Sequence, residues 1–182
     1  MLLVCLAVLC LALTVPAAAD NIAYSNGSLN GQYHAWPINS GSVISDSFTL
    51  HSAFGGLVIR VTGFQFWVWT LPGDSPNTVT WSITSQPNGG TIYASRTAQL
   101  ASYFVWTNRL GYSVYRVNIP PMPTVNLPPG TYWLNLTNGT TTQRRIMYWD
   151  ENDGPSQAFQ NTVTPIGSES FLVWSLCPYC QP

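Results

Sequence analysis

The chain has 182 residues and a formal net charge of −1, and only 7% of its residues are charged. Lysine is absent and the six arginines are scattered, so the basic stripe that phosphate neutralisation requires is missing and nucleic acid is not an expected partner. Aromatic residues make up 13% of the chain, and this high aromatic content with low charge excludes an intrinsically disordered protein.

An apolar segment opens the chain. Residues 1–19 are almost wholly apolar, break at Pro16 and end in three alanines, which is the pattern of a secretory signal peptide cleaved before Asp20. No basic residue precedes the apolar run, which departs from that pattern. A membrane anchor is the alternative, but a span needs about 20 apolar residues and this run breaks at Pro16. We therefore expect secretion, one domain in residues 20–176, a short tail in residues 177–182 and no membrane span in the mature chain.

Alternation of apolar and polar side chains runs through most of the remaining chain. It indicates half-buried antiparallel strands, because successive side chains of a strand leave opposite faces. The alternation is clearest at Gly63–Trp69, Thr78–Thr84 and Thr131–Thr137. Weaker patterns predict strands at Ser45–Leu50, Leu57–Thr62, Thr91–Ala94, Tyr112–Ile119, Arg145–Trp149 and Ser168–Trp174. Thr97–Phe104 comes nearest to helical periodicity and suits one short turn.

Turn-forming residues separate these segments. They are Leu71–Asp74, Pro87–Gly90, Pro128–Gly130, Asn138–Gly139 after the third clear strand, and Asp153–Pro155. About eight to ten short strands with a turn signal roughly every 8–12 residues predict an all-β fold, an antiparallel β-sandwich. The long proline-rich connections suit crossovers between two sheets and favour a jelly roll over an immunoglobulin-like topology.

Four tryptophans lie on the polar phase of their predicted strands, opposite the expected core residues: Trp67, Trp69, Trp133 and Trp149. An exposed indole flanked by Asn and Gln can stack on the apolar face of a sugar ring while the amides bond its hydroxyls. These four residues are therefore candidates for an aromatic, ligand-binding platform. For any single one of them burial under long loops is favoured over a place in the platform, because tryptophan is usually mostly buried.

The densest group of carboxylates lies in residues 148–154. Asp150, Asn152 and Asp153 are candidate Ca²⁺ ligands, because calcium takes several oxygen ligands and often binds in loops. The spacing is not that of an EF-hand, so a solvated turn in which Asp and Asn cap their own backbone is favoured, with structural calcium as the alternative. No other cofactor is expected.

Cys177 and Cys180 form a CPYC motif in the tail. In an exported protein two nearby thiols usually oxidise, so a disulfide is the favoured interpretation. A metal or intermolecular role is an alternative. Redox catalysis is a further one, but it would require a helix N-terminus in a thioredoxin-type fold, and no such pattern surrounds the motif.

Several short segments resemble a group of secreted bacterial proteins that often carry a C-terminal sorting signal of the PEP-CTERM type. The segments are Ser45–Phe48, Gly63–Trp69, Trp81–Ile83 with Gly89–Thr91, Leu127–Leu134, Tyr148–Asn152 and Ser168–Phe171. The resemblance implies a small β-sandwich and assigns no catalytic residue. The sorting tail itself is absent, which favours simple secretion over anchoring in the envelope.

Three classes of function are compared: an enzyme, a binding protein and a structural protein. An enzyme is not expected, because few residues are charged and nothing in the sequence brings Asp46, Asp74 or Glu169 opposite the carboxylates of residues 148–154. We expect a non-catalytic extracellular protein that binds a glycan or a cell-envelope polymer. A structural or adhesive protein of the envelope or matrix is the alternative, and the sequence leaves the oligomeric state open.

Overall fold

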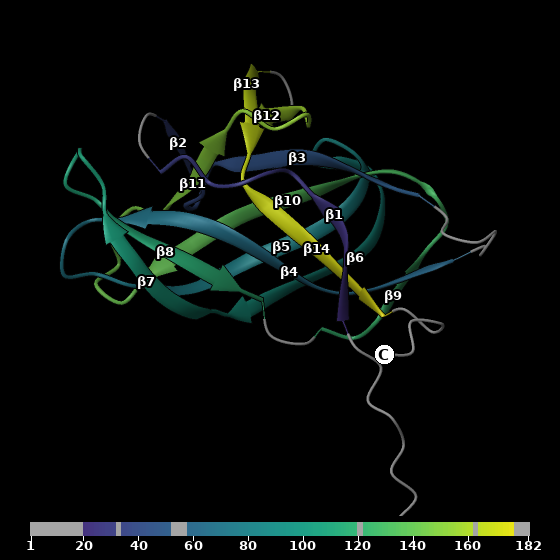
Figure 1. Ribbon diagram of the computed structural model, residues 1–182, viewed down its shortest axis with the longest axis horizontal. Coiled ribbons are helices and arrows are strands. Elements are labelled where there is room, and N and C mark those ends of the chain that lie inside the picture. Colours follow the sequence, from purple (N-terminus) through teal and green to yellow (C-terminus); the bar gives the residue numbers. More distant parts are fainter. Residues whose placement is uncertain (1–19, 32–33, 52–57, 120–121, 162–163, 177–182) are drawn as a thin grey trace, which may run out of the picture.

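The computed structural model describes residues 20–31, 34–51, 58–119, 122–161 and 164–176, and within these ranges the chain forms fourteen β-strands and no helix (Figure 1). The strands are β1 (Asp20–Ser25), β2 (Ala35–Pro37), β3 (Val43–Leu50), β4 (Ile59–Thr70), β5 (Pro76–Gln86), β6 (Gly89–Gln99), β7 (Ala101–Thr107), β8 (Ser113–Asn118), β9 (Val125–Leu127), β10 (Gly130–Thr141), β11 (Tyr148–Asn152), β12 (Ala158–Gln160), β13 (Thr164–Glu169) and β14 (Phe171–Leu176). The all-β prediction is confirmed. No helix long and apolar enough to cross a membrane occurs in the described ranges.

All pairings between the strands are antiparallel, and they join the strands into one large open sheet. One group of strands runs in the order β12-β3-β10-β5-β6. A second group surrounds β4, which pairs with β14 and β11 along one edge and with β9 and β8 along the other. β13 pairs with both β11 and β12 and so connects the two groups at one end.

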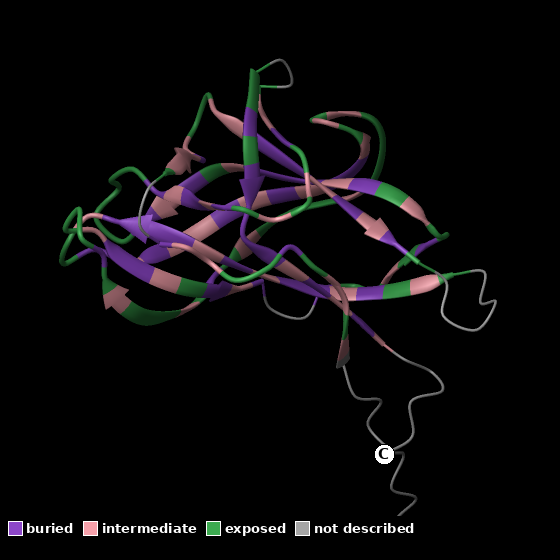
Figure 2. Ribbon diagram, turned by 45° about the horizontal axis from the view of Figure 1, so that its top comes forward, coloured by how far each residue is buried: buried purple, intermediate pink, exposed green. Residues whose placement is uncertain are grey.

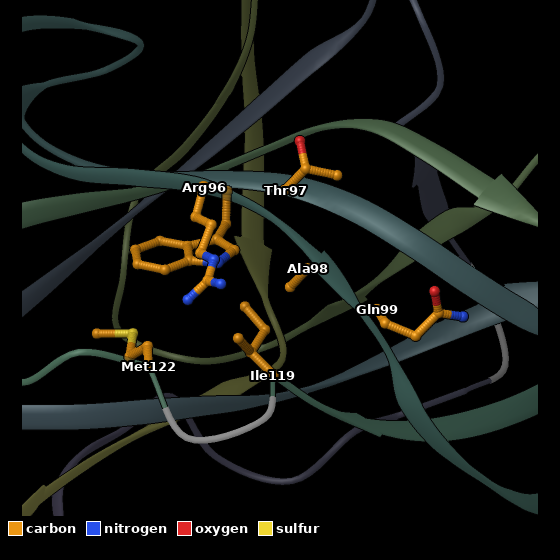
Figure 3. Close-up of a pocket in the computed structure, with 7 residues that line it drawn as sticks. Arg96, Thr97, Ala98, Gln99, Ile119 and Met122 are labelled. Carbon is orange, nitrogen blue, oxygen red and sulfur yellow. The ribbon is translucent and has the colours of Figure 1, made fainter.

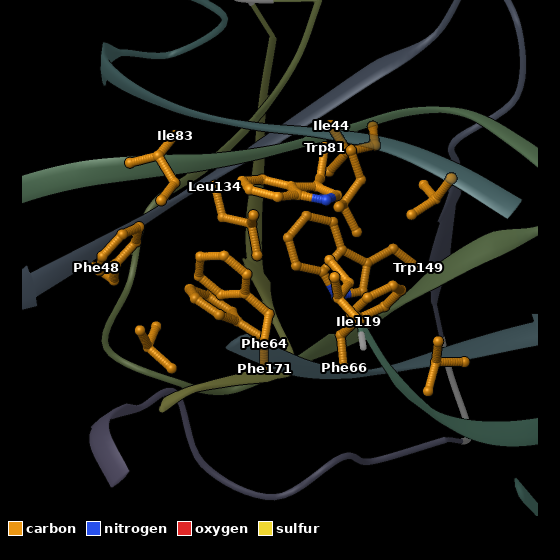
Figure 4. Close-up of a cluster of buried hydrophobic side chains, with 14 of the residues drawn as sticks. Ile44, Phe48, Phe64, Phe66, Trp81, Ile83, Ile119, Leu134, Trp149 and Phe171 are labelled. Carbon is orange, nitrogen blue, oxygen red and sulfur yellow. The ribbon is translucent and has the colours of Figure 1, made fainter. Parts of the chain in front are cut away.

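The two groups of strands face each other across a single core. The Phe48 ring of β3 lies 6.1 Å from Phe64 of β4 and 6.2 Å from Phe171 of β14. Trp81 of β5 reaches across in the same way, 5.9 Å from Phe64 (Figure 4). The predicted inward phase of the three clearest strands is buried throughout, and buried residues alternate with more exposed ones along the long strands (Figure 2). Each such side chain contributes about 1.5–3 kcal/mol of hydrophobic stabilisation.

Several predicted elements differ from the observed ones. The segment Thr97–Phe104 is not a helical turn but the end of β6 and the start of β7, with the chain crossing from one group of strands to the other at the buried Leu100. The segments predicted as separate strands around Gly63 are one continuous strand, β4. Conversely, the predicted strand Ser168–Trp174 is broken at Ser170 into two strands, β13 and β14. β13, which connects the two groups of strands, ends there and β14 continues beside β4. Five strands had not been predicted: β1, β2, β7, β9 and β12.

The predicted turns occur with one exception. Asp74 N donates to Leu71 O at 3.1 Å, and Asn88 at the β5–β6 turn adopts a left-handed φ of 44°. Asn138–Gly139 does not end its strand. It forms a β-bulge inside β10, where the register against β5 shifts between Thr137 and Thr140 and Asn138 has a φ of 50°. The left-handed residue is accommodated by the bulge, so pairing continues to Thr141.

Candidate functional site

Trp149 is completely buried, so the prediction that it faces away from the core is wrong. β11 pairs antiparallel with β4 so that Trp149 lies opposite the inward-pointing Val68, and directly opposed residues share a face of the sheet. Its ring lies 6.1 Å from Phe66 and 5.7 Å from Phe171, and its Nε1 donates to Ser170 O at 3.0 Å. The tryptophan is a central core residue.

Trp69 has the predicted outward phase and yet is only 3% exposed. The Tyr112 ring packs 5.8 Å from it, and its Nε1 donates to Asp150 Oδ1 at 2.7 Å. Trp67 and Trp133 are half-buried on β4 and β10, which belong to different groups of strands. These two therefore lie on outer faces of opposite groups, and the four predicted tryptophans do not form one platform.

The three residues predicted as calcium ligands do not converge. Asp150 is buried, and its carboxylate accepts hydrogen bonds from Gly31 N, Trp69 Nε1 and Ser170 Oγ. Asn152 is also buried and its Oδ1 accepts from Gly154 N at 3.1 Å, so the predicted cap of its own backbone is present although the turn is not solvated there. Asp153 is exposed. Among the described residues, no three His, Cys, Asp or Glu side chains are arranged to hold a metal ion.

Asn152 instead belongs to a largely buried group of side chains, with Asp150 at its border. We call this group the polar cluster, and its members are Asn26, Asp46, Asn152, Ser156, Ser168 and Glu169. Asn26 Nδ2 donates to Ser156 Oγ and Ser168 Oγ at 2.6 and 2.7 Å. Ser156 Oγ donates to Asp46 Oδ2 at 2.8 Å, and Ser168 Oγ donates to Asn152 Oδ1 at the same distance. The network ties together segments that are far apart in the sequence.

The carboxyl groups at this place hold their protons unusually strongly. Burial raises the pKa of Asp46 from 3.8 to about 7, although hydrogen bonds from Ser156 and the Glu169 backbone lower it. Burial likewise raises the pKa of Asp150 to about 6, against hydrogen bonds from Ser170 and Trp69. For Glu169, burial and then the charges of Asp46, Glu151 and Asp150 raise the pKa well above its usual range.

The sequence did not suggest that Asp46 and Glu169 meet, because 123 positions separate them. For each residue, however, one feature of the sequence indicated that its side chain is buried. Asp46 shares the inward phase of β3 with Ile44 and Phe48, and Glu169 lies two residues before the core residue Phe171. A carboxylate in phase with core residues must find partners inside the protein.

A groove lies along β6, the strand at one end of the strand order. It consists of two adjoining hollows of about 190 and 380 Å³ that share Trp81 and Arg96. This β6 groove is lined by residues 93–99, Trp81, Ile119 and residues 122–126. In Figure 3, Arg96 and Ala98 come from β6, and Ile119 and Met122 face them from the segment that leads to β9.

The β6 groove combines apolar surface with polar groups. Tyr93 is 41% exposed and packs edge-on against Tyr132 at 5.1 Å between ring centroids. Trp81 is buried, and its Nε1 has no hydrogen-bond partner. The sequence could not indicate this, because Trp81 was correctly expected in the core and an unpaired N–H group depends on what surrounds the ring.

A wider hollow of about 640 Å³ lies between loops near the bulge of β10. Its lining consists of small polar residues with Arg144 and Arg145, and it contains no aromatic side chain. It therefore lacks the ring face on which sugars commonly stack.

The predicted signal peptide and the CPYC motif with Cys177 and Cys180 lie outside the described residues. No known protein family and no curated protein matches the sequence.

Proposed function

We propose that the protein is a secreted, non-catalytic β-sandwich, jelly-roll-like in topology, that binds an extracellular glycan or cell-envelope polymer in the β6 groove. Support for secretion comes from the signal-peptide pattern of residues 1–19. Support for a sandwich comes from the two groups of strands that face each other across one core.

One observation carries the proposed binding site. Trp81 Nε1 is a buried donor without a partner, and leaving such a group unsatisfied costs about 1–3 kcal/mol. Trp81 lines both hollows of the groove, so a shift of the side chains that cover its Nε1 would let a hydroxyl or carbonyl oxygen of a ligand seated there accept this hydrogen bond. The binding of a ligand would then recover a cost that the free protein carries.

The surrounding residues suit a carbohydrate. Ile119 and Met122, which are almost fully buried, form apolar wall, and Tyr93 supplies a ring that is 41% exposed. Arg96, Gln99 and Asn126 supply hydrogen-bonding groups for hydroxyls or carboxylates. Specific sites of this kind combine apolar walls with a few placed polar groups. The groove is open along β6, which suits a chain-like ligand better than an enclosed small molecule.

The test is titration of intrinsic tryptophan fluorescence with a panel of neutral and acidic polysaccharides, followed by affinity electrophoresis with those that bind. Arg96→Ala and Tyr93→Ala are each expected to weaken binding by about tenfold or more, because each removes a direct contact. Arg116→Ala is a matched control, since this exposed arginine lies on β8 and packs 5.2 Å over Tyr103.

Trp133→Ala separates the groove from the outer face of β10, where Trp133 packs 5.5 Å from Phe159. Unchanged binding in this variant agrees with the groove. Loss of binding in Trp133→Ala but not in Arg96→Ala would place the ligand on the outer face instead. Failure of every polysaccharide to bind would reject the proposed function.

A structural or adhesive role is the second candidate, and one observation favours it. β7 pairs only with β8 among the described strands, so its other edge is unpaired, and it exposes Tyr103, Phe104 and Val105 without a charged residue. Natural edge strands usually carry charge or proline that blocks pairing with another chain. Concentration-dependent association in sedimentation velocity, together with no polysaccharide binding, would favour this role.

A further inference from the structure

When ionised, the carboxyl groups in and beside the polar cluster carry more negative charge than their visible partners balance. Asp46, Asp150 and Glu169 are all fully buried, and Glu151 lies half-buried beside them. The chain contains no lysine, and all six arginines are exposed. The hydrogen bonds received by Asp46 and Asp150 come from hydroxyl, amide and indole groups, which are neutral. A buried charge normally requires a paired charge or a metal ion.

Three carboxylate oxygens in this cluster have no hydrogen-bond partner: Glu169 Oε1, Glu169 Oε2 and Asp46 Oδ1. The contrast with their neighbours is clear. Asp46 Oδ2 accepts three hydrogen bonds, and both oxygens of Asp150 accept at least one. Asp46 Oδ2 also accepts from the backbone N of Glu169 at 2.7 Å, and the charge of Asp46 contributes to the raised pKa of the Glu169 carboxyl group, so the two residues meet at one place in the fold.

We propose that Asp46 and Glu169 bind a calcium ion through these unpartnered oxygens. Two carboxylates carry the charge that a divalent cation neutralises. Calcium accepts about six to eight oxygen ligands in irregular arrangements, and the cluster provides neutral oxygens such as those of Ser156 and Ser168 close to Asp46. Magnesium usually retains several waters and suits a buried site less well, and zinc prefers nitrogen and sulfur ligands.

This site differs from the one predicted from the sequence. Asp150 and Asn152 have their oxygens engaged by protein donors, and Asp153 is exposed. The proposed ligands come from β3 and β13, so a bound ion would link the first group of strands to the strand that connects both groups. The inference does not depend on the proposed glycan binding.

The test compares thermal unfolding of the protein at pH 7.5 in EDTA and in calcium chloride. At a calcium concentration about 100 times Kd, the melting temperature is expected to rise by roughly 5–10 °C. Glu169→Gln keeps the size of the side chain but removes its charge, and is expected to abolish the shift. Asp153→Asn, the matched control in the exposed part of the acidic loop, is expected to retain it.

Terbium luminescence sensitised by tryptophan measures binding without reference to stability. We expect emission that calcium displaces from the wild-type protein and from Asp153→Asn, and its loss in Glu169→Gln. An equal calcium shift in Glu169→Gln, or loss of the shift in Asp153→Asn, would overturn the proposal. So would identical unfolding in EDTA and calcium, which would show that protons alone neutralise the two carboxylates.

Discussion

Two tryptophans with the same predicted role have different environments. Trp149 is fully buried against Phe66 and Phe171, whereas Trp133 is half-buried on the outer face of β10. Trp149→Ala is expected to lower the free energy of unfolding by about 3–5 kcal/mol, because it leaves a large cavity and an unpaired Ser170 carbonyl. Trp133→Ala should cost clearly less. Urea denaturation of both variants measures the difference, and equal losses would contradict the assignment of Trp149 to the core.

The sequence predicted whether a side chain faces the core only where the two-residue alternation of its own strand was enough to decide this. Phe64, Phe66 and Leu134 were correctly expected in the core because their strands alternate over their full length. Trp149 was misassigned because its partner in the sheet, Val68, is 81 residues away from it, and no local pattern shows which residues of two strands stand opposite each other. The contact between Asp46 and Glu169 could not be predicted for the same reason, because it depends on strands that are far apart in the sequence.

At the scale of the strand, the bulge in β10 depends on a glycine. Gly139 N donates to Ile38 O at 2.6 Å, and a Cβ at this position would lie 2.7 Å from Met147 Cε and 3.0 Å from Ile38 O. Gly139→Ala is therefore expected to destabilise the fold by about 1–3 kcal/mol, since the backbone of residue 38 cannot move aside freely.

Gly89→Ala provides the matched control for this contact. A Cβ at Gly89 would meet only Pro87 O, at 3.6 Å, which is ordinary contact. The free energy of unfolding should stay unchanged or rise by up to about 1 kcal/mol, because alanine restricts the unfolded chain. Chemical denaturation of the two variants should therefore give effects of different size, and a neutral Gly139→Ala would show that the bulge tolerates a side chain.

The strands that the sequence revealed and those that it did not also differ in a physical property. β4, β5 and β10 each alternate core residues with residues of the opposite face, which are mainly Thr and Ser in β5, Thr, Asn and Trp133 in β10, and Gln65, Trp67 and Trp69 in β4, so their alternation is strong. β7 is exposed over most of its length, as is β6, of which the sequence indicated only Thr91–Ala94. β2, β9 and β12 have three residues each, which is too short to show a two-residue period. Their strand structure comes from pairing with longer neighbours.

For the whole molecule, the buried carboxyl groups predict an unusual dependence on pH. Asp46 and Asp150 have ordinary pKa values of 3.8 that burial raises to about 7 and about 6, and the pKa of Glu169 is also raised. Between pH 4 and 7 the folded state therefore binds more protons than the unfolded state, so the free energy of unfolding falls as pH rises through this window.

Urea denaturation in EDTA across this range measures the effect. The calcium-free protein is expected to be more stable at pH 5 than at pH 8, and Asp46→Asn should make the dependence shallower because one of the titrating groups is gone. A stability maximum near pH 8 in EDTA would contradict the raised pKa values of these groups.

The position of β14 sets the time at which the core can close. β14 lies between β1 and β4 and places Phe171 against Phe48 and Trp149, while β1 pairs only with β14 among the described strands. A ribosome that adds about 5–20 residues each second needs roughly 7–30 s to pass from β1 to β14. Throughout this interval the aromatic face of β4 is without its final neighbour and the first strand is without its partner. Completion of this core therefore waits for β14, and the interval before β14 is synthesised is when the described strands are most open to aggregation and proteolysis.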